Sequence, residues 1–170
     1  MHSLLTVRAV CMTQPQSSGV TWRAKLFPTC LLYTSDAADD RGAVLHMLKH
    51  NDSSFAGFGE IYFSKILVGQ RKAWRRHAHA TSQLAVPNGY VRFVLCDQRE
   101  GSTSCDTIQE VEIGETNYQL LTIPPNVWFA LQCIGSTDAL IANCSSSVHD
   151  PSAVERHDVE SQTIPYVWRN

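Results

Sequence analysis

Residues 71–89 read RKAWRRHAHATSQLAVPNG, and the choice of fold and of chemistry depends on this stretch. His77 and His79 lie two residues apart, and Gln83 follows four residues later. Side chains two apart on a β-strand project to the same face of the sheet, so a strand here would place the two imidazoles side by side. Small β-barrels often present a metal in this way. The first questions are therefore whether the chain forms a barrel and whether it binds a metal.

The segments around this stretch predict an all-β protein. They are short, rich in β-branched and aromatic residues, and separated by Gly, Pro, Asn or Ser. Within YVRFVLCD (90–97), for example, Val91, Phe93 and Leu95 alternate with Arg92 and Val94. Strands that recur every 8–12 residues without helices between them indicate an antiparallel sandwich or barrel. The other segments of this kind are GEIYFSKILVG (59–69), IQEVEIG (108–114), YQLLTIPP (118–125), VWFALQCIG (127–135) and ALIANCS (139–145).

The two ends of the chain differ from this pattern. Residues 1–39 show no sustained period, and the string YTSDAAD (33–39) resembles translated sequencing-adapter read-through. We expect residues 1–39 to be a poorly ordered segment, and their origin stays open, whereas residues 40–170 form one domain. RGAVLHMLKHND (41–52) is interpreted as a strand. DPSAVERHD (150–158) predicts a short C-terminal helix, with Asp150 as its cap and Pro151 at its first position.

The composition excludes several classes of protein. A length of 170 residues, with 44% hydrophobic and 18% charged residues, suits one globular domain. The net charge of −2 does not favour binding to nucleic acid, and no apolar run approaches the ~18 residues of a membrane span. None of the six cysteines forms a C-x-x-C pair, so we expect free, buried thiols in a reducing compartment. With no clear signal peptide, the expected location is the cytoplasm.

The order of the features resembles a cupin, a double-stranded β-helix or jelly-roll barrel. Metal-binding cupins carry a first motif ending in His-x-His-x3-Glu and a second motif, Pro-x-Gly-x2-His. In this chain Gln83 stands in place of the carboxylate and Phe129 in place of the second motif's histidine. Two imidazoles alone do not complete the usual three- or four-ligand site, so we expect no metal and no cofactor. A metal-dependent cupin enzyme remains the weaker alternative.

Residues 40–170 also resemble a metal-independent branch of the cupins, the dTDP-4-dehydrorhamnose 3,5-epimerase family. The order and spacing of several short pieces carry this resemblance, whereas each piece alone is weak. These pieces are DDRG (39–42), GEIYFS (59–64), REGS (99–102), IGETNYQLLTIPPNVW (113–128), ANCSSSVHDPSAVER (142–156) and IPYVW (164–168).

The resemblance implies a homodimer that acts on a nucleotide-activated keto-deoxysugar in the synthesis of surface polysaccharides. It also implies a histidine base supported by an aspartate, a lysine beside the enolate, and a tyrosine acid. The chain departs from this pattern, because Arg75 occupies the base position and stays protonated at physiological pH. No lysine follows Lys72, and Ala142 stands where the tyrosine is expected. The function is therefore either that of an epimerase-like isomerase or that of a non-catalytic protein that binds a sugar nucleotide or serves as a pathway scaffold.

The candidate catalytic residues are His77, as a displaced base, and Asp158, in the position of the supporting aspartate. A guanidinium matches phosphate oxygens in a bidentate fashion, so arginines of this region are candidates for holding the ligand. The alternatives are a polar lining of the barrel mouth for the histidines, surface salt bridges for the arginines, and core packing for the aromatic residues. The candidate substrate-binding residues are Arg41, Arg75, His79, Tyr118 and Trp128.

Overall fold

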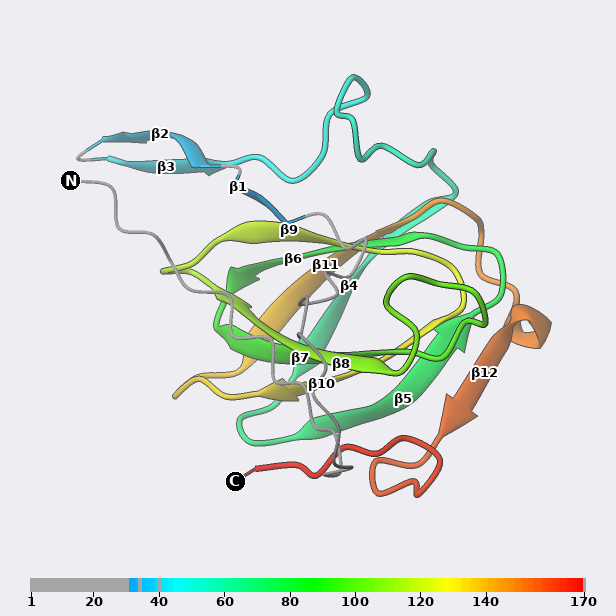
Figure 1. Ribbon diagram of the computed structural model, residues 1–170. Coiled ribbons are helices and arrows are strands. Elements are labelled where there is room, and N and C mark those ends of the chain that lie inside the picture. Colours follow the sequence, from blue (N-terminus) through cyan, green and yellow to red (C-terminus); the bar gives the residue numbers. More distant parts are fainter. Residues whose placement is uncertain (1–30, 34, 40, 170) are drawn as a thin grey trace, which may run out of the picture.

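The computed structural model describes residues 31–33, 35–39 and 41–169, and the chain folds into two five-stranded antiparallel sheets (Figure 1). The first sheet has the strand order β1-β9-β6-β11-β4, and the second has the order β12-β5-β10-β7-β8. A third, two-stranded sheet pairs β2 with β3 and extends away from the other two (Figure 1). The strands are β1 (Leu31–Tyr33), β2 (Ser35–Asp39), β3 (Gly42–Leu45), β4 (Glu60–Ile66), β5 (Arg71–His77), β6 (Ser82–Asn88), β7 (Tyr90–Asp97), β8 (Thr107–Gly114), β9 (Gln119–Ile123), β10 (Val127–Cys133), β11 (Ala139–Ser145) and β12 (Val154–His157).

This architecture confirms the predicted all-β, cupin-type jelly roll. The main core lies between the two large sheets and is formed by alternate residues of their strands. In β7, Val91, Phe93 and Leu95 belong to this core, as the alternation in the sequence predicts. In β10, Val127 and Phe129 face the core, while Trp128 and Ala130 face the other side of the sheet. Among the described residues, no helix is long and apolar enough to span a membrane.

A second apolar cluster covers the outer face of the second sheet. It joins Trp74 of β5 and Trp128 of β10 to Ile164 and Trp168 from the end of the chain. The indole nitrogens of Trp74 and Trp168 both donate to the carbonyl of Val159, at 3.2 and 3.1 Å. The closing IPYVW segment (164–168) thus packs against the barrel as an outer layer.

The predicted C-terminal helix is wrong in its extent. Asp150 does act as a cap, accepting a hydrogen bond from the Ser152 amide at 2.9 Å, but the helix is only a single 3₁₀ turn, η1 (Pro151–Ala153). The residues that follow form β12, which pairs with the free edge of β5. The backbone partners that β5 offers, together with an ion pair of 2.7 Å between Arg76 and Glu155, favour a strand over further helical turns. The predicted strand in residues 41–52 is confirmed for β3 only.

The prediction for the N-terminal segment falls largely on residues 1–30, which lie outside the described residues. Of the described part, β1 pairs with β9 at one edge of the first sheet. The four cysteines of the described chain, Cys96, Cys105, Cys133 and Cys144, are free thiols, and all but Cys105 are buried.

Candidate functional site

A cavity of about 260 Å³ lies where the edge strands of the two large sheets come together. Strands β4 and β11 of the first sheet form one wall, and the end of β5 with the start of β12 forms the opposite wall. The loop after β11 completes it. The lining residues are Glu60, Tyr62, His77, His79, Ala80, Asn143, Ser145, Ser147, Val148, His149, Asp150, Ala153 and Val154.

Gly59 allows the loop after β11 to close over the start of β4. A Cβ atom at position 59 would lie 2.1 Å from the backbone carbon of Ser147, a distance that no side chain can adopt without a backbone shift. The Gly59 amide donates to the carbonyl of Ser145 at 2.8 Å and fixes this approach. The rim of the cavity is therefore set by backbone contact between β4 and residues 145–148.

Strand β5 divides the basic residues of its motif between two faces. Arg76 points outward, where it pairs with Glu155 and lies 4.8 Å from the ring centre of Trp128. Arg75 and His77 point inward, because the Arg75 guanidinium lies 5.3 Å from the ring centre of Phe129, and the His77 ring stacks on Phe129 at 6.0 Å. Arg75, which stands in the base position of the family resemblance, therefore faces the interior of the barrel.

The surroundings of His77 favour the neutral form of its imidazole. Burial lowers its pKa below 6.5, and the nearby positive charges of Arg75, His149 and Arg156 lower it further, against a smaller opposite effect from Glu60. Its Nε2 atom is buried and has no hydrogen-bond partner among the described residues. Buried polar atoms are nearly always hydrogen-bonded in a folded protein, so an unpartnered nitrogen in the wall of a cavity indicates a position where a ligand completes the bond.

Two cations of β5, Lys72 and Arg75, also face the interior; of the two, only Arg75 acts on the pKa of His77, and neither lines the cavity. Burial lowers the pKa of Arg75, and burial with the charge of Arg75 lowers the pKa of Lys72. The Lys72 ammonium donates to the hydroxyl of Ser64 on β4, across the barrel. In the described part of the chain, neither cation has a carboxylate within ion-pair distance. Unpaired positive charge in a partly buried site favours a ligand that carries or develops negative charge.

A phenol is present in the cavity although the sequence pointed to its loss. Tyr62 of β4 lines the cavity, and its hydroxyl oxygen accepts a hydrogen bond from Asn143 Nδ2 at 2.6 Å. Since the oxygen is the acceptor in this bond, its own hydrogen remains available to a ligand. The family resemblance implied the tyrosine at the position of Ala142 on β11, and the sheet places Tyr62 directly opposite the next residue, Asn143. Tyr62, Ser64 and Ile66 alternate along β4 and share its inward face. This alternation was the signal in the sequence that could have identified Tyr62.

The other candidate residues differ in whether they line this cavity. His79 is exposed and lines the cavity. Trp128 is buried on the outer face of the second sheet, where it stacks on His157 with ring centres 4.5 Å apart. Tyr118 is buried, and burial raises its pKa. Arg41 and Asp158 are exposed, and neither lines the cavity. No group of three or more His, Cys, Asp and Glu side chains is placed to hold a metal ion within the described ranges.

The jelly roll, with a polar cavity where the edges of its two large sheets come together, defines a small cupin-type barrel. No protein-family model matches the chain. The chain is 39% identical to a dTDP sugar isomerase from Desulfovibrio desulfuricans G20, whose structure superimposes with a TM-score of 0.79 over 83% of this chain and 90% of that one. It is 27% identical over 131 residues to the probable low-salt glycan biosynthesis epimerase Agl13 of Haloferax volcanii, which covers 76% of this chain and 81% of the relative.

The dTDP-4-dehydrorhamnose 3,5-epimerase of Elizabethkingia anophelis NUHP1 shares the fold. Its TM-score is 0.75 at 13% identity, over 87% of this chain and 85% of that one. The chain belongs to the dTDP-4-dehydrorhamnose 3,5-epimerase family, together with these sugar isomerases and epimerases.

Proposed function

We propose that the protein is an isomerase of a nucleotide-activated keto-deoxysugar, with His77 as the base and Tyr62 as the acid. The observation that carries this proposal is the unpartnered Nε2 of a neutral His77 in the same cavity as the Tyr62 hydroxyl. A general base must be unprotonated at working pH and within reach of the proton that it removes. The 39% identical relative is a dTDP sugar isomerase, which supports a thymidine nucleotide as the handle of the sugar.

The reaction needs three functions from these residues. His77 Nε2 takes a proton from a carbon beside the ketone, and the electron pair left behind moves onto the ketone oxygen as an enolate. Arg75 and Lys72 stabilise the negative oxygen, since a fixed cation in a partly desolvated site is worth more than in water. Tyr62 then donates its proton to carbon, and the phenolate recovers a proton from the imidazolium or from water. Arg75 and Tyr62 interact electrostatically, so the phenolate would form beside a positive charge.

The relatives support a biological setting for this reaction. The Haloferax relative is a probable glycan biosynthesis epimerase, which supports a role in making a deoxysugar for a surface polysaccharide, in the manner of dTDP-rhamnose. We propose that the protein works as a homodimer in the cytoplasm and without a metal, as the family resemblance implies. Asp158 is proposed to support the site from outside the cavity, and Arg41 and His79 to contact the nucleotide.

A second candidate function is sugar-nucleotide binding without catalysis. Arg75 favours it, because an arginine stands where the resemblance implies the base, and a guanidinium does not abstract protons near neutral pH.

Deuterium exchange in D₂O separates the two functions. A dTDP-4-keto-6-deoxysugar is incubated with the protein, and its label is followed by NMR. Wild type is expected to exchange a proton on a carbon beside the ketone, and His77→Asn and Tyr62→Phe to lose at least 100-fold in rate, in line with the 10²–10⁴ typical of general acid–base catalysis. His50→Asn, an exposed histidine in the loop before β4, is the control and keeps the wild-type rate. Binding of the sugar nucleotide with no exchange in wild type would overturn the isomerase and favour the second function.

A further inference from the structure

Two polar atoms of residues in the cavity wall are buried and have no hydrogen-bond partner. They are Nε2 of His77, the base proposed above, and Oδ1 of Asn143 on β11. No other buried, unpartnered side-chain atom of the described chain belongs to a residue that lines this cavity. Buried polar atoms are nearly always hydrogen-bonded, so both positions indicate a bond that a ligand completes. The proposed reaction uses the histidine and leaves the asparagine oxygen without a role.

The first sheet fixes Asn143 in this wall. Strand β11 lies between β4 and β6, and Ile141, two residues before Asn143, belongs to the main core, so Asn143 faces the interior of the barrel. Asn143 is only 4% exposed and lies opposite Tyr62 in the backbone pairing. Its Nδ2 donates to the Tyr62 hydroxyl oxygen at 2.6 Å. The amide is therefore held at its nitrogen end, while its oxygen end stays unpartnered.

The other polar residues of the same wall have partners or reach water. The Ser145 hydroxyl donates to the carbonyl of Ser147 at 2.7 Å and accepts from its amide at 3.4 Å, so it is committed to the rim of the cavity. Glu60, at the start of β4, is only half-buried, and water can satisfy its carboxylate. On this wall the oxygen of Asn143 is thus the acceptor that a bound ligand has to satisfy.

An amide oxygen only accepts hydrogen bonds, which restricts the group that can lie against it. The ketone oxygen and the ring oxygen of a keto sugar are acceptors too, and the ketone oxygen becomes more negative as the enolate forms. The methyl group of a 6-deoxysugar neither donates nor accepts. A hydroxyl of the sugar ring does donate, so the oxygen of Asn143 matches a hydroxyl and repels the oxygen that carries the enolate charge.

We propose that Asn143 determines specificity, because its Oδ1 accepts a hydrogen bond from the hydroxyl on the carbon beside the ketone. The inference rests on the proposed function for the class of sugar and adds which side of the ketone enters the site. In a 4-keto-6-deoxysugar, C3 carries a hydroxyl, whereas C5 carries the methyl group. Since one amide binds both the Tyr62 hydroxyl and the sugar hydroxyl, the acid lies on the C3 side of the ketone.

The same amide also positions the acid. Because Nδ2 donates to the oxygen of Tyr62, the phenol hydrogen is left for the ligand. A carboxylate in place of the amide would accept that hydrogen instead and draw it away from the sugar. The two ends of Asn143 therefore have separate roles, and different substitutions remove them separately.

Binding of two sugars tests the oxygen end. Isothermal titration calorimetry compares a dTDP-4-keto-6-deoxysugar with its analogue that lacks the C3 hydroxyl. Wild type is expected to bind the analogue about tenfold or more weakly, because a site built to bond a hydroxyl rejects the ligand without it. Asn143→Ala should bind the two sugars within about threefold of each other, and comparing the two ratios cancels any general effect of the substitution. Asn51→Ala, an exposed asparagine in the loop before β4, is the control and keeps the wild-type ratio.

Equal binding of the two sugars by wild type would overturn the proposal. Asn143→Ala that prefers the hydroxyl as strongly as wild type would also overturn it, because another residue or a water would then meet the hydroxyl. Asn143→Asp keeps the shape and the acceptor, so it should keep the preference. This variant decides the matter if Asn143→Ala does not fold, and a lost preference in it counts against the proposal.

Deuterium exchange at C3 tests the nitrogen end. In Asn143→Asp we expect the exchange rate to fall about tenfold or more while the sugar binds about as tightly as to wild type, a split that a general loss of structure would not produce. An unchanged rate would overturn the positioning of Tyr62. Wild type that prefers the hydroxyl but exchanges nothing would overturn the isomerase and leave the recognition by Asn143 standing. Wild type that exchanges, with a preference that Asn143→Ala retains, would overturn this inference alone.

Discussion

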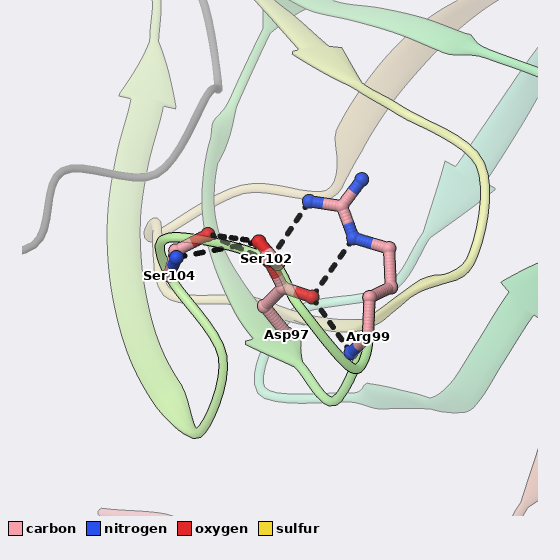
Figure 2. Close-up of polar contacts among 4 residues, drawn as sticks. All are labelled: Asp97, Arg99, Ser102 and Ser104. Atoms are coloured by element: carbon pink, nitrogen blue, oxygen red, sulfur yellow. Dashed lines mark hydrogen bonds and ion pairs between the residues drawn. The ribbon is translucent and has the colours of Figure 1, made fainter.

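Asp97 at the end of β7 is a fully buried carboxylate whose replacement should strongly destabilise the fold (Figure 2). It accepts three hydrogen bonds from Arg99, from the backbone amide at 3.0 Å, from Nε at 2.9 Å and from Nη2 at 2.8 Å. The hydroxyls of Ser102 and Ser104 donate to it at 2.7 and 2.6 Å. Five donors on one carboxylate hold the loop between β7 and β8, which contains the REGS piece (99–102) of the family resemblance.

Asp97→Asn keeps the shape of the side chain and removes its charge. Breaking a buried ion pair by changing one partner typically costs 3–5 kcal/mol. The Arg99 side chain is 26% exposed and can regain water, which places the expected loss near the lower end, at about 3 kcal/mol. At roughly 2–4 °C per kcal/mol for a domain of this size, the melting temperature should fall by about 6–12 °C.

The same carboxylate predicts a pH dependence with a definite sign. Burial alone would raise the pKa of Asp97, but the hydrogen bonds from Arg99, Ser104 and Ser102 together lower it well below its usual range. The unfolded chain, with a pKa of about 3.9 at this residue, therefore binds the proton more readily than the folded chain. The stabilisation is complete above that pH and is lost as the pH falls through the folded-state pKa. Asp97→Asn lacks this contribution, so the two proteins should converge in stability at low pH.

Urea unfolding between pH 2.5 and pH 7 measures both effects. Glu100→Gln is the matched control, because Glu100 lies in the same loop but is exposed, and its change should be within about 0.5 kcal/mol of wild type. An Asp97→Asn variant within 1 kcal/mol of wild type at pH 7 would refute the reasoning. An equal loss of stability with falling pH in wild type and variant would also refute it, because the titration would then belong to other groups.

Two further predictions concern the site and the N-terminal segment. Since the pKa of His77 is lowered, kcat/KM should fall only at pH values below the ordinary range of an imidazole, as the base becomes protonated. Arg75→Gln removes a charge that lowers this pKa, so it should move the acidic limb of the kcat/KM profile to higher pH. An acidic limb that stays in place would exclude His77 as the titrating base. A chain that begins at Asp40 should melt within ~5 °C of the full chain, because the only described strand that it removes from the large sheets, β1, has three residues at a sheet edge; a larger drop would show that residues 1–39 pack on the barrel.

The alternation of apolar residues predicted the strands well because each core strand buries one face or both. Strand β7 shows this directly, with Val91, Phe93 and Leu95 in the main core. Local sequence patterns failed to predict the secondary structure where pairing with a strand distant in the sequence determines it. Asp150 and Pro151 do begin a helical turn, but the free edge of β5, more than 70 residues earlier in the chain, recruits the next residues into β12. No local pattern contains that information.

The sequence identified the site residue on the strand that carries the motif, but not the site residues that neighbouring strands contribute. The HAH spacing predicted His77 and His79 on one face of a strand; both line the cavity, but β5 ends at His77 and His79 lies in the bend that follows. Tyr62 was missed because it reaches the site from β4, on the opposite wall, through its pairing with Asn143 of β11. The family pattern implies a lysine downstream of the motif, whereas Lys72 within the motif reaches across the barrel to Ser64. Cross-strand neighbours follow from register, and register is fixed only when the fold is known.

The position of His77 suggests how a family member can keep the barrel and change its reaction. Arg75 stands where the resemblance implies the base, and His77 follows two residues later on the same inward face. Two residues along a strand correspond to about 6.6 Å, so a base at 77 would meet a different part of a sugar bound in the same orientation. The arginine at 75 would then contribute charge to an enolate oxygen rather than remove a proton. The ring position that acquires deuterium reports which carbon the base reaches, and label at both carbons flanking the ketone, as in a 3,5-epimerase, would contradict a simple displacement of the base along β5.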